Sequence, residues 1–219
     1  MTASLPLRFP RGLYGITPEW EDTARLLDAI RAAYDGGMQV LQWRRKLAPT
    51  ALHHQQRQAV QTLCQQLGLP LIINDDWQSA RELGVAGAHL GREDGELRHA
   101  RAGLAPQQWL GSSCYDRLDL AEQALQIGVD YVAFGAVYPS QVKPNAPRAT
   151  LTVLQQGRAL CERFAQNERA AVVAIGGITS TNAAPLIQAG VDSIAVISSL
   201  FEAEDIYTEA RAFSRLFQM

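Results

Sequence analysis

Two acidic residues that each follow a short, mainly apolar segment are the first candidates for chemistry. Asp75 follows the segment 71–74, and Asp94 comes a few residues after the segment 86–90. In a buried parallel strand the apolar residues form the core, and the residue past the carboxyl end faces the site. Two carboxylates at neighbouring strand ends repel each other unless a cation or a shared proton lies between them. Magnesium, which proteins bind through one or two carboxylates and phosphate oxygens, is the cation that this pattern predicts. Helix capping is the alternative role for either carboxylate taken singly, and it is the preferred role of Asp76.

A basic segment supplies groups that suit a phosphate. Gln42, Arg44 and Lys46 alternate along the end of an apolar segment, so they point to one face, while Trp43 and Arg45 point to the other. An amide and two cations on one face suit a multiply charged anion such as pyrophosphate. The alternative interpretation is a solvated basic loop.

A second anion site is predicted at the last two strand ends. Gly176 and Gly177 follow one apolar segment, and Ser198 and Ser199 follow the next. Backbone N–H groups in these late loops form the usual phosphate site of TIM barrels, although a pair of glycines can also be only a tight turn. Two anion sites at one mouth suit two phosphorylated substrates, with the metal serving a leaving pyrophosphate.

Two further strand ends carry candidate groups. Ser113 offers a hydroxyl, and Cys114 beside it is interpreted as a small buried thiol, because no histidine motif accompanies it. The loop that begins at Tyr138 contains Lys143, with Arg148 nearby, and its length is typical of a functional loop such as a lid.

The segments that must position these residues alternate in type along the chain. Short apolar segments are separated by segments of helical periodicity, which is the pattern of an α/β fold, here a single-domain TIM (β/α)8 barrel. We expect this domain to cover residues 1–219, with 1–12 as an N-terminal extension. An open doubly wound sheet is the alternative. The predicted strands are 13–16, 38–43, 71–74, 86–90, 109–112, 131–134, 171–175 and 193–197, and the predicted helices are 21–34, 50–67, 77–83, 96–102, 116–126, 151–164, 181–189 and 206–217.

A short pattern recurs before three of these strands. A glycine, then valine or methionine, then a polar or acidic residue occurs at 36–39, 128–130 and 190–192. The pattern is interpreted as a repeated device that ends a helix and starts a strand, because glycine commonly follows the last turn of a helix.

Composition narrows the classes of function. Hydrophobic residues make up 47% of the 219 residues, which is enough for one sizeable core. A net charge of -2 and a pI of about 6.1 give no electrostatic footprint for nucleic acid or an anionic membrane. No signal peptide or membrane span is predicted, and three widely spaced cysteines suit a reducing compartment. We therefore expect a cytoplasmic protein that acts on small molecules, and a homo-oligomer is compatible with the sequence.

Taken together and in this order, the motifs resemble the thiamine phosphate synthase family over nearly the whole chain, from Leu13 to the last predicted helix. Each motif is weak alone, but the set is specific. The motifs are Gln42-Trp43-Arg44-Arg45-Lys46, Asn74-Asp75-Asp76, residues 89–94, Tyr138-Pro139 through Lys143, Ile175-Gly176-Gly177-Ile178 and Val196-Ile197-Ser198.

The resemblance implies a transferase of thiamine biosynthesis that uses Mg2+. It condenses 4-amino-2-methyl-5-hydroxymethylpyrimidine diphosphate with 4-methyl-5-hydroxyethylthiazole phosphate to give thiamine phosphate and diphosphate. Diphosphate leaves first, and the thiazole nitrogen captures the resulting pyrimidine carbocation. The implied residues for the pyrimidine diphosphate are Gln42, Arg44, Lys46 and Asn74, and those for the metal are Asp75 and Asp94. The implied catalytic residues are Arg44, Lys46, Ser113 and Lys143, of which Ser113 and Lys143 also bind substrate. The implied residues for the thiazole phosphate are Ser140, Gln141, Val142, Gly177, Ile197 and Ser198.

This sequence departs from the family pattern at two places. The loop that begins at Tyr138 contains Ser140-Gln141-Val142-Lys143, where the family usually has Thr-x-Thr-Lys. Val142 therefore provides no hydroxyl at the position of the second threonine. Arg45 stands where a glutamate is common and is expected to add positive charge beside the site.

Two other functions are left open. A thiazole tautomerase-like isomerase occurs on a related barrel, but that subfamily lacks the full pair of acidic residues, so Asp75 and Asp94 argue against it. A non-catalytic binder of phosphorylated thiamine precursors is the other, and the Val142 departure is the only hint of it.

Overall fold

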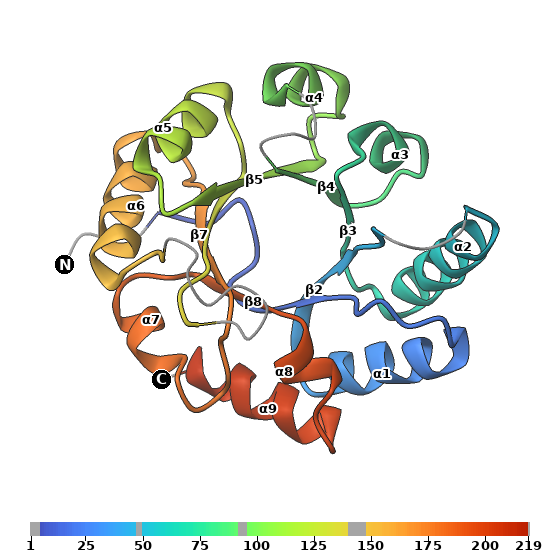
Figure 1. Ribbon diagram of the computed structural model, residues 1–219. Helices are drawn as coiled ribbons and strands as arrows, with labels where there is room; N and C mark the ends of the chain where they lie inside the picture. Colours follow the sequence, from blue (N-terminus) through green and yellow to red (C-terminus); the bar gives the residue numbers. More distant parts are fainter. Residues whose placement is uncertain (1–4, 47–49, 92–95, 140–147, 219) are drawn as a thin grey trace.

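The strands of the protein form a closed parallel barrel. The computed structural model describes residues 5–46, 50–91, 96–139 and 148–218. In it the eight strands follow one another around the barrel in chain order, and the ring closes where β8 pairs with β1 (Figure 1). The predicted TIM barrel is confirmed, and the open sheet is wrong because this closing pair leaves the barrel no edge strands. The strands are β1 (Gly12–Ile16), β2 (Met38–Trp43), β3 (Leu71–Asn74), β4 (Gly87–Leu90), β5 (Trp109–Tyr115), β6 (Tyr131–Phe134), β7 (Ala171–Ile175) and β8 (Ser193–Val196).

Helices surround the barrel and cover the outer side of its sheet (Figure 1). Several begin where a side chain caps the first turn: Asp22 accepts from Arg25 N, and Asp205 accepts from Thr208 N. No helix in the described ranges is long and apolar enough to cross a membrane. The helices are α1 (Thr23–Asp35), α2 (Thr50–Leu67), α3 (Trp77–Glu82), α4 (Leu97–Gly103), α5 (Leu118–Ile127), α6 (Leu151–Arg163), α7 (Ala184–Gln188), α8 (Ser198–Phe201) and α9 (Ile206–Leu216).

The largest differences from the predicted helices are at α7 and α8. Helix α7 starts three residues later than expected, because Asn182 closes a turn by accepting from Thr179 N and Pro185 lies in the first turn of the helix. Helix α8 is not predicted at all, since four residues are too few to show helical periodicity. It follows β8 directly and brings Ser198 to the carboxyl end of the barrel.

Alternation along the strands divides the core into two layers. In β1, Tyr14 and Ile16 belong to the cluster inside the barrel, whereas Leu13 belongs to the larger cluster between the strands and the helices. Bulky side chains that fill the barrel interior make it a packed core and leave the carboxyl end for a site.

The glycine–valine–acid motif at 128–130 and 190–192 has a second function in the structure. Gly128 and Gly190 have positive φ angles of 92° and 97°, as expected after a helix. The acid that follows each one bonds the preceding strand: Asp130 Oδ2 accepts from Leu110 N at 2.8 Å, and Asp192 Oδ2 accepts from Val172 N at 2.9 Å. The repeat therefore ends a helix and also fixes the next strand against its neighbour.

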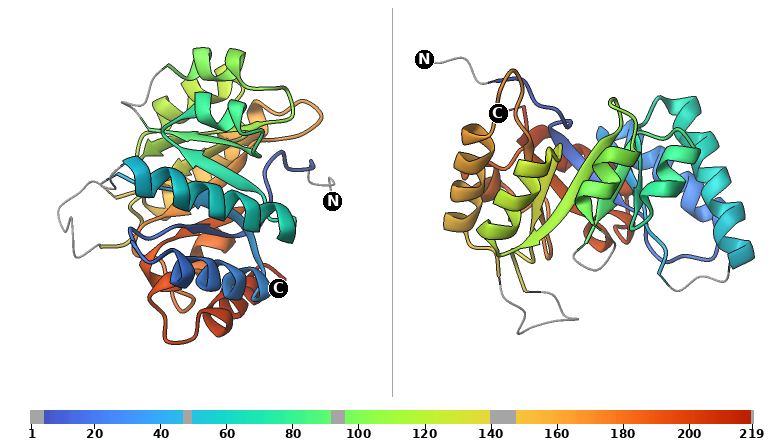
Figure 2. Two further views of the ribbon diagram at one scale, coloured as in Figure 1. Left: turned by 90° about the vertical axis from the view of Figure 1, so that its right-hand side faces the viewer. Right: turned by 90° about the horizontal axis from the view of Figure 1, so that it is seen from above.

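The N-terminal segment lies across one end of the barrel, as the two views in Figure 2 show. Leu7 pairs with Arg169 just before β7, and Phe9 is 1% exposed. The ring of Phe9 lies 4.2 Å from that of Tyr131 and 5.3 Å from that of Trp109, which begin two neighbouring strands. The described part of the expected N-terminal extension thus closes the amino end of the barrel.

Replacing Phe9 by Ala should destabilise the protein substantially. The substitution removes an aromatic ring from a packed interior, which costs about 3–5 kcal/mol. Chemical denaturation would measure the loss, with Leu5→Ala as the control because Leu5 lies in the same segment and is 40% exposed. A loss below about 1 kcal/mol would show that the segment does not contribute to the core.

Candidate active site

A pocket of about 510 Å³ opens at the carboxyl ends of the strands. Its floor is made by inward-facing residues of the barrel, including Tyr14, His89 and Ala133. The structure brings together here the predicted residues Gln42, Arg44, Lys46, Asn74, Asp75, Ser113 and Ile197.

A second pocket of about 660 Å³ adjoins the first at the ends of β7 and β8. Gly177 and Ser198 line it, and Ile175, Ala195 and Ile197 line both pockets. The residues of the two predicted anion sites therefore lie in adjoining pockets at one mouth of the barrel.

The remaining predicted site residues are Asp94, Ser140, Gln141, Val142 and Lys143, and all of them lie outside the described residues.

The loop that follows β6 is held at its start against the loop that follows β7. Tyr138 donates its hydroxyl to Asn182 O at 2.8 Å. Gly177 has a φ of 66°, and a Cβ at this position would come within 2.9 Å of Tyr138 Cβ and of Pro139 O. Glycine is required here for both reasons, and the close approach joins the loop start to the second pocket.

The basic strand end is positioned by the loop after β1. Thr17 is buried, and its Oγ1 accepts from Arg44 N at 2.9 Å and donates to Arg44 O at 3.1 Å. Thr17 N also donates to Gln42 O at 2.9 Å. This hydrogen bonding continues the barrel beyond the end of β2, so Arg44 keeps the strand alternation that points it into the pocket.

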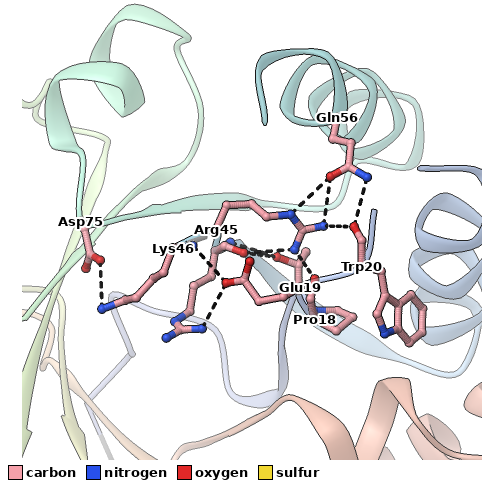
Figure 3. Close-up of polar contacts among 9 residues, drawn as sticks. Pro18, Glu19, Trp20, Arg45, Lys46, Gln56 and Asp75 are labelled. Atoms are coloured by element: carbon pink, nitrogen blue, oxygen red, sulfur yellow. Dashed lines mark hydrogen bonds and ion pairs between the residues drawn. The ribbon is translucent and has the colours of Figure 1, made fainter. Parts of the chain in front are cut away.

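Both cations of the strand end pair with carboxylates. Lys46 Nζ lies 3.5 Å from Asp75 Oδ2 (Figure 3), and Arg44 Nη1 lies 3.6 Å from Glu19 Oε1. Glu19 Oε1 also accepts from Lys46 N at 3.0 Å. These pairs are partly exposed, so each contributes little to stability but sets where the charges lie. Glu19 was not predicted from the sequence, because it comes from a loop with no motif of its own.

Removing the charge of Glu19 should strengthen diphosphate binding. In Glu19→Gln the amide oxygen can still accept from Lys46 N, but the carboxylate no longer competes with an anion for Arg44. Loss of one partly exposed pair predicts inorganic diphosphate binding that is tighter by about two- to fivefold. Isothermal titration calorimetry measures this, with the exposed neighbour Glu21→Gln as the control. Weaker binding would instead mean that Glu19 acts mainly by orienting Arg44.

Arg45 points away from the pocket, as the alternation predicted. Its guanidinium lies 4.6 Å from the Trp43 ring centroid and donates to Trp20 O at 2.8 Å and to Pro18 O (Figure 3). It also donates to Gln56 Oε1 of α2 at 3.1 Å. The expectation that Arg45 adds positive charge beside the site is wrong, because these bonds hold the guanidinium on the other side of the strand, where it ties the β1–α1 loop to α2.

Two adjacent aspartates at the end of β3 have different roles. Asp76 caps α3, since its Oδ1 accepts from Ser79 N at 2.8 Å, and this confirms its predicted role. Asp75 has a φ of 66°, in the left-handed region that Asp and Asn tolerate better than most residues. Its backbone N donates to His89 O at 2.8 Å, and its carboxylate lines the pocket beside Lys46.

The oxygen ligands at Asp75 and Asn74 suit a hard divalent cation. The carboxylate of Asp75 and the side-chain amide oxygen of Asn74 are oxygen ligands in one pocket, and Mg2+ takes only one or two carboxylates together with phosphate oxygens and water. Within the described residues, no group of three or more His, Cys, Asp or Glu side chains is placed to hold a metal ion. A magnesium site would therefore depend on Asp75, Asp94 and the bound phosphates.

A line of buried polar groups connects two of the predicted site residues. Ser113 Oγ lies 2.8 Å from His89 Nε2, and His89 Nδ1 lies 3.1 Å from Tyr131 OH. Tyr131 OH lies 2.9 Å from Tyr14 OH, which accepts from Gln42 Nε2 at 2.7 Å. Burial raises the pKa of both tyrosines, so both hydroxyls stay neutral. The sequence reasoning missed the two tyrosines and His89; the one available signal was a histidine inside an otherwise apolar strand.

Cys114 is buried and has no role in the pocket. Burial raises the pKa of its thiol to about 12, and Sγ lies 3.6 Å from Ser112 O. A protonated thiol in the core is not a nucleophile, so the predicted structural role is confirmed.

A closed parallel barrel with a charged pocket at the carboxyl ends of its strands is the architecture of a TIM-barrel enzyme. Comparison with protein families identifies which one. The model of the family described as thiamine monophosphate synthase matches residues 13–200, and the chain belongs to this family.

Individual relatives agree with the family match over nearly the full chain. The chain is 51% identical over 213 residues to the thiamine-phosphate synthase of Bordetella avium (strain 197N), covering 97% of this chain and 98% of the relative. It is 47% identical to that of Thiobacillus denitrificans (strain ATCC 25259 / T1), covering 95% and 96%. The solved thiamine phosphate pyrophosphorylase of Pyrococcus furiosus superposes with a TM-score of 0.79 at 30% identity, covering 96% of this chain and 97% of that one. The resemblance seen in the sequence is therefore confirmed.

Proposed function

We propose that the protein is a transferase of thiamine biosynthesis. It joins 4-amino-2-methyl-5-hydroxymethylpyrimidine diphosphate to 4-methyl-5-hydroxyethylthiazole phosphate and releases diphosphate. The observation that carries the proposal is the adjoining pair of pockets, one lined by Arg44, Lys46 and Asp75 and the other by Gly177 and Ser198. The names of its relatives, thiamine-phosphate synthases at 47–51% identity, support the same reaction.

The first step is departure of diphosphate from the pyrimidine. Arg44 and Lys46 line one face of the pocket, so their charges stabilise the negative charge that grows on the leaving group. The ring amino group of the pyrimidine stabilises the cation that remains. No protein nucleophile is needed, which agrees with the burial of the Cys114 thiol.

The second step is capture of the cation by the thiazole nitrogen. Gly177, Ile197 and Ser198 would hold the thiazole phosphate in the second pocket, beside the pyrimidine. Holding two reactants together in one mouth removes much of the entropic barrier to their reaction. By resemblance we also assign Ser140, Gln141 and Val142 to this phosphate.

Two further groups complete the proposed site. Magnesium, held by Asp75 and Asp94, would supply charge neutralisation at the diphosphate when bound. Lys143 is assigned to the departing diphosphate by resemblance. Lys46 lies 3.5 Å from Asp75. A side-chain cation is therefore already held where the negative charge of the leaving diphosphate would develop.

The state of the cysteines suits a reducing compartment such as the cytoplasm. Cys64, Cys114 and Cys161 are free and buried, and none of them forms a disulfide.

An assay of the purified protein with both substrates and magnesium tests the proposal. The expected result is thiamine phosphate and diphosphate in equal amounts. Isomerisation of a thiazole carboxylate phosphate without coupling would favour the tautomerase. Binding of either substrate with no product would favour the non-catalytic binder, and either result would overturn the proposal.

A further inference from the structure

The buried polar line beneath the first pocket connects two residues that line the pocket. It runs from Gln42 through Tyr14, Tyr131 and His89 to Ser113, each on a different strand, with successive distances of 2.7, 2.9, 3.1 and 2.8 Å. Polar groups inside a barrel core are costly unless each has a hydrogen-bond partner, so this line is a built feature of the interior.

The orientation of the Gln42 amide in the structure favours one order of donors along the line. Gln42 Nε2 can only donate, so Tyr14 OH accepts from it. In the order that follows, the Tyr14 proton is directed to Tyr131 OH, 2.9 Å away. In the same order Tyr131 OH donates to His89 Nδ1, 3.1 Å away, and the imidazole proton is on Nε2. His89 Nε2–H then donates to Ser113 Oγ.

The two ends of the line present opposite groups to the pocket, which both Gln42 and Ser113 line. The Ser113 oxygen accepts from His89, so its own proton is available to donate to a ligand. One N–H of the Gln42 amide is used by Tyr14, and its Oε1, which accepts no hydrogen bond from the described residues, can accept from a ligand. Turning the Gln42 amide would reverse every bond in the line, giving a donor at Gln42 and an acceptor at Ser113.

We propose that Tyr14, Tyr131 and His89 are positioning residues that couple Gln42 and Ser113, so that the pocket offers one acceptor and one donor to a pyrimidine ring. This inference rests on the proposed function. A 4-aminopyrimidine presents a donor in its amino group and an acceptor in the adjacent ring nitrogen, which complements that pair. A 4-oxo ring presents an acceptor and a ring N–H donor, which opposes it. The line therefore selects the amino ring, because a mismatched ring leaves buried polar groups without partners.

The first test is spectroscopic and needs no turnover. The protein has four histidines, and comparison of 15N-histidine spectra with those of His89→Asn assigns the His89 signals. We expect the tautomer protonated at Nε2 in the native protein and a mixture of tautomers in Tyr131→Phe, which removes the hydroxyl from Nδ1. Ser193→Ala is the control, because it removes another buried barrel hydroxyl, one that donates to Gly12 O at 2.9 Å at the far end of β8. The Nδ1 tautomer in the native protein, or no change in Tyr131→Phe, would overturn the proposal.

The second test is kinetic. Tyr131→Phe and Tyr14→Phe should each raise the KM for the pyrimidine diphosphate about tenfold and reduce selectivity over the 4-oxo analogue by a similar factor. The KM for the thiazole phosphate should change less than about twofold in both variants and in Ser193→Ala. Equal increases in both KM values, or an unchanged preference for the amino ring, would show that the tyrosines are only structural. If the native protein makes no thiamine phosphate, the proposed function fails, while the tautomer of His89 still decides whether the line has the stated direction.

Discussion

Asp75→Asn should lower kcat by about 100-fold or more, the loss typical of removing one group that stabilises transition-state charge. The substitution keeps the size of the side chain, and asparagine tolerates the positive φ of 66° found at this position. What it removes is the carboxylate charge beside Lys46, 3.5 Å away, and with it a hard ligand for magnesium. The loss should therefore be partly recovered at high magnesium concentration, while binding of the thiazole phosphate is unchanged.

The neighbouring residue provides a matched control for this prediction. Asp76 carries the same carboxylate but caps α3 through Ser79 N. Asparagine caps helices about as well as aspartate, so Asp76→Asn should keep both stability and kcat. Equal losses in the two variants would indicate a general effect of charge at this strand end, and full activity of Asp75→Asn at every magnesium concentration would remove Asp75 from the metal site.

The fold could be predicted from sequence because its signals are local. Apolar segments and the glycines that end helices identified the strands, and Gly128 and Gly190 adopt the positive φ that this role implies. The errors occurred where local signals conflict or are too short. Pro185 delays the start of α7, and α8 is shorter than the repeat that would reveal it.

The site was predictable to the extent that it follows strand alternation. Gln42, Arg44 and Lys46 share a pocket because they lie two residues apart on one strand end. The residues that were missed act through contacts between distant segments: Tyr14 and Tyr131 are separated by 117 positions, and no spacing rule connects them. Their meeting depends on the closure of the barrel, which brings inward-facing residues of different strands together.

Adjacent arginines on opposite faces of one strand end should show opposite effects when each is replaced by methionine. Arg44→Met should lower kcat/KM for the pyrimidine diphosphate by about 100- to 1,000-fold, because it removes a charge aimed at the leaving group. Its stability should fall by less than about 1 kcal/mol, since the pair with Glu19 at 3.6 Å is partly exposed. Arg45→Met should lower the free energy of unfolding by about 1–3 kcal/mol, because it removes the donors to Trp20 O, Pro18 O and Gln56.

Each arginine variant is the control for the other when steady-state kinetics and chemical denaturation are applied to both. Arg45→Met should keep kcat/KM within about tenfold of the native value, because Thr17 still bonds both the N–H and the C=O of Arg44. A large loss of activity in Arg45→Met with little loss of stability would mean that its charge acts in the pocket after all. Nearly native activity in Arg44→Met would contradict the assignment of the strand end to the diphosphate. Because the two residues are neighbours with the same charge, the face of the strand is the variable that separates catalysis from support of the fold.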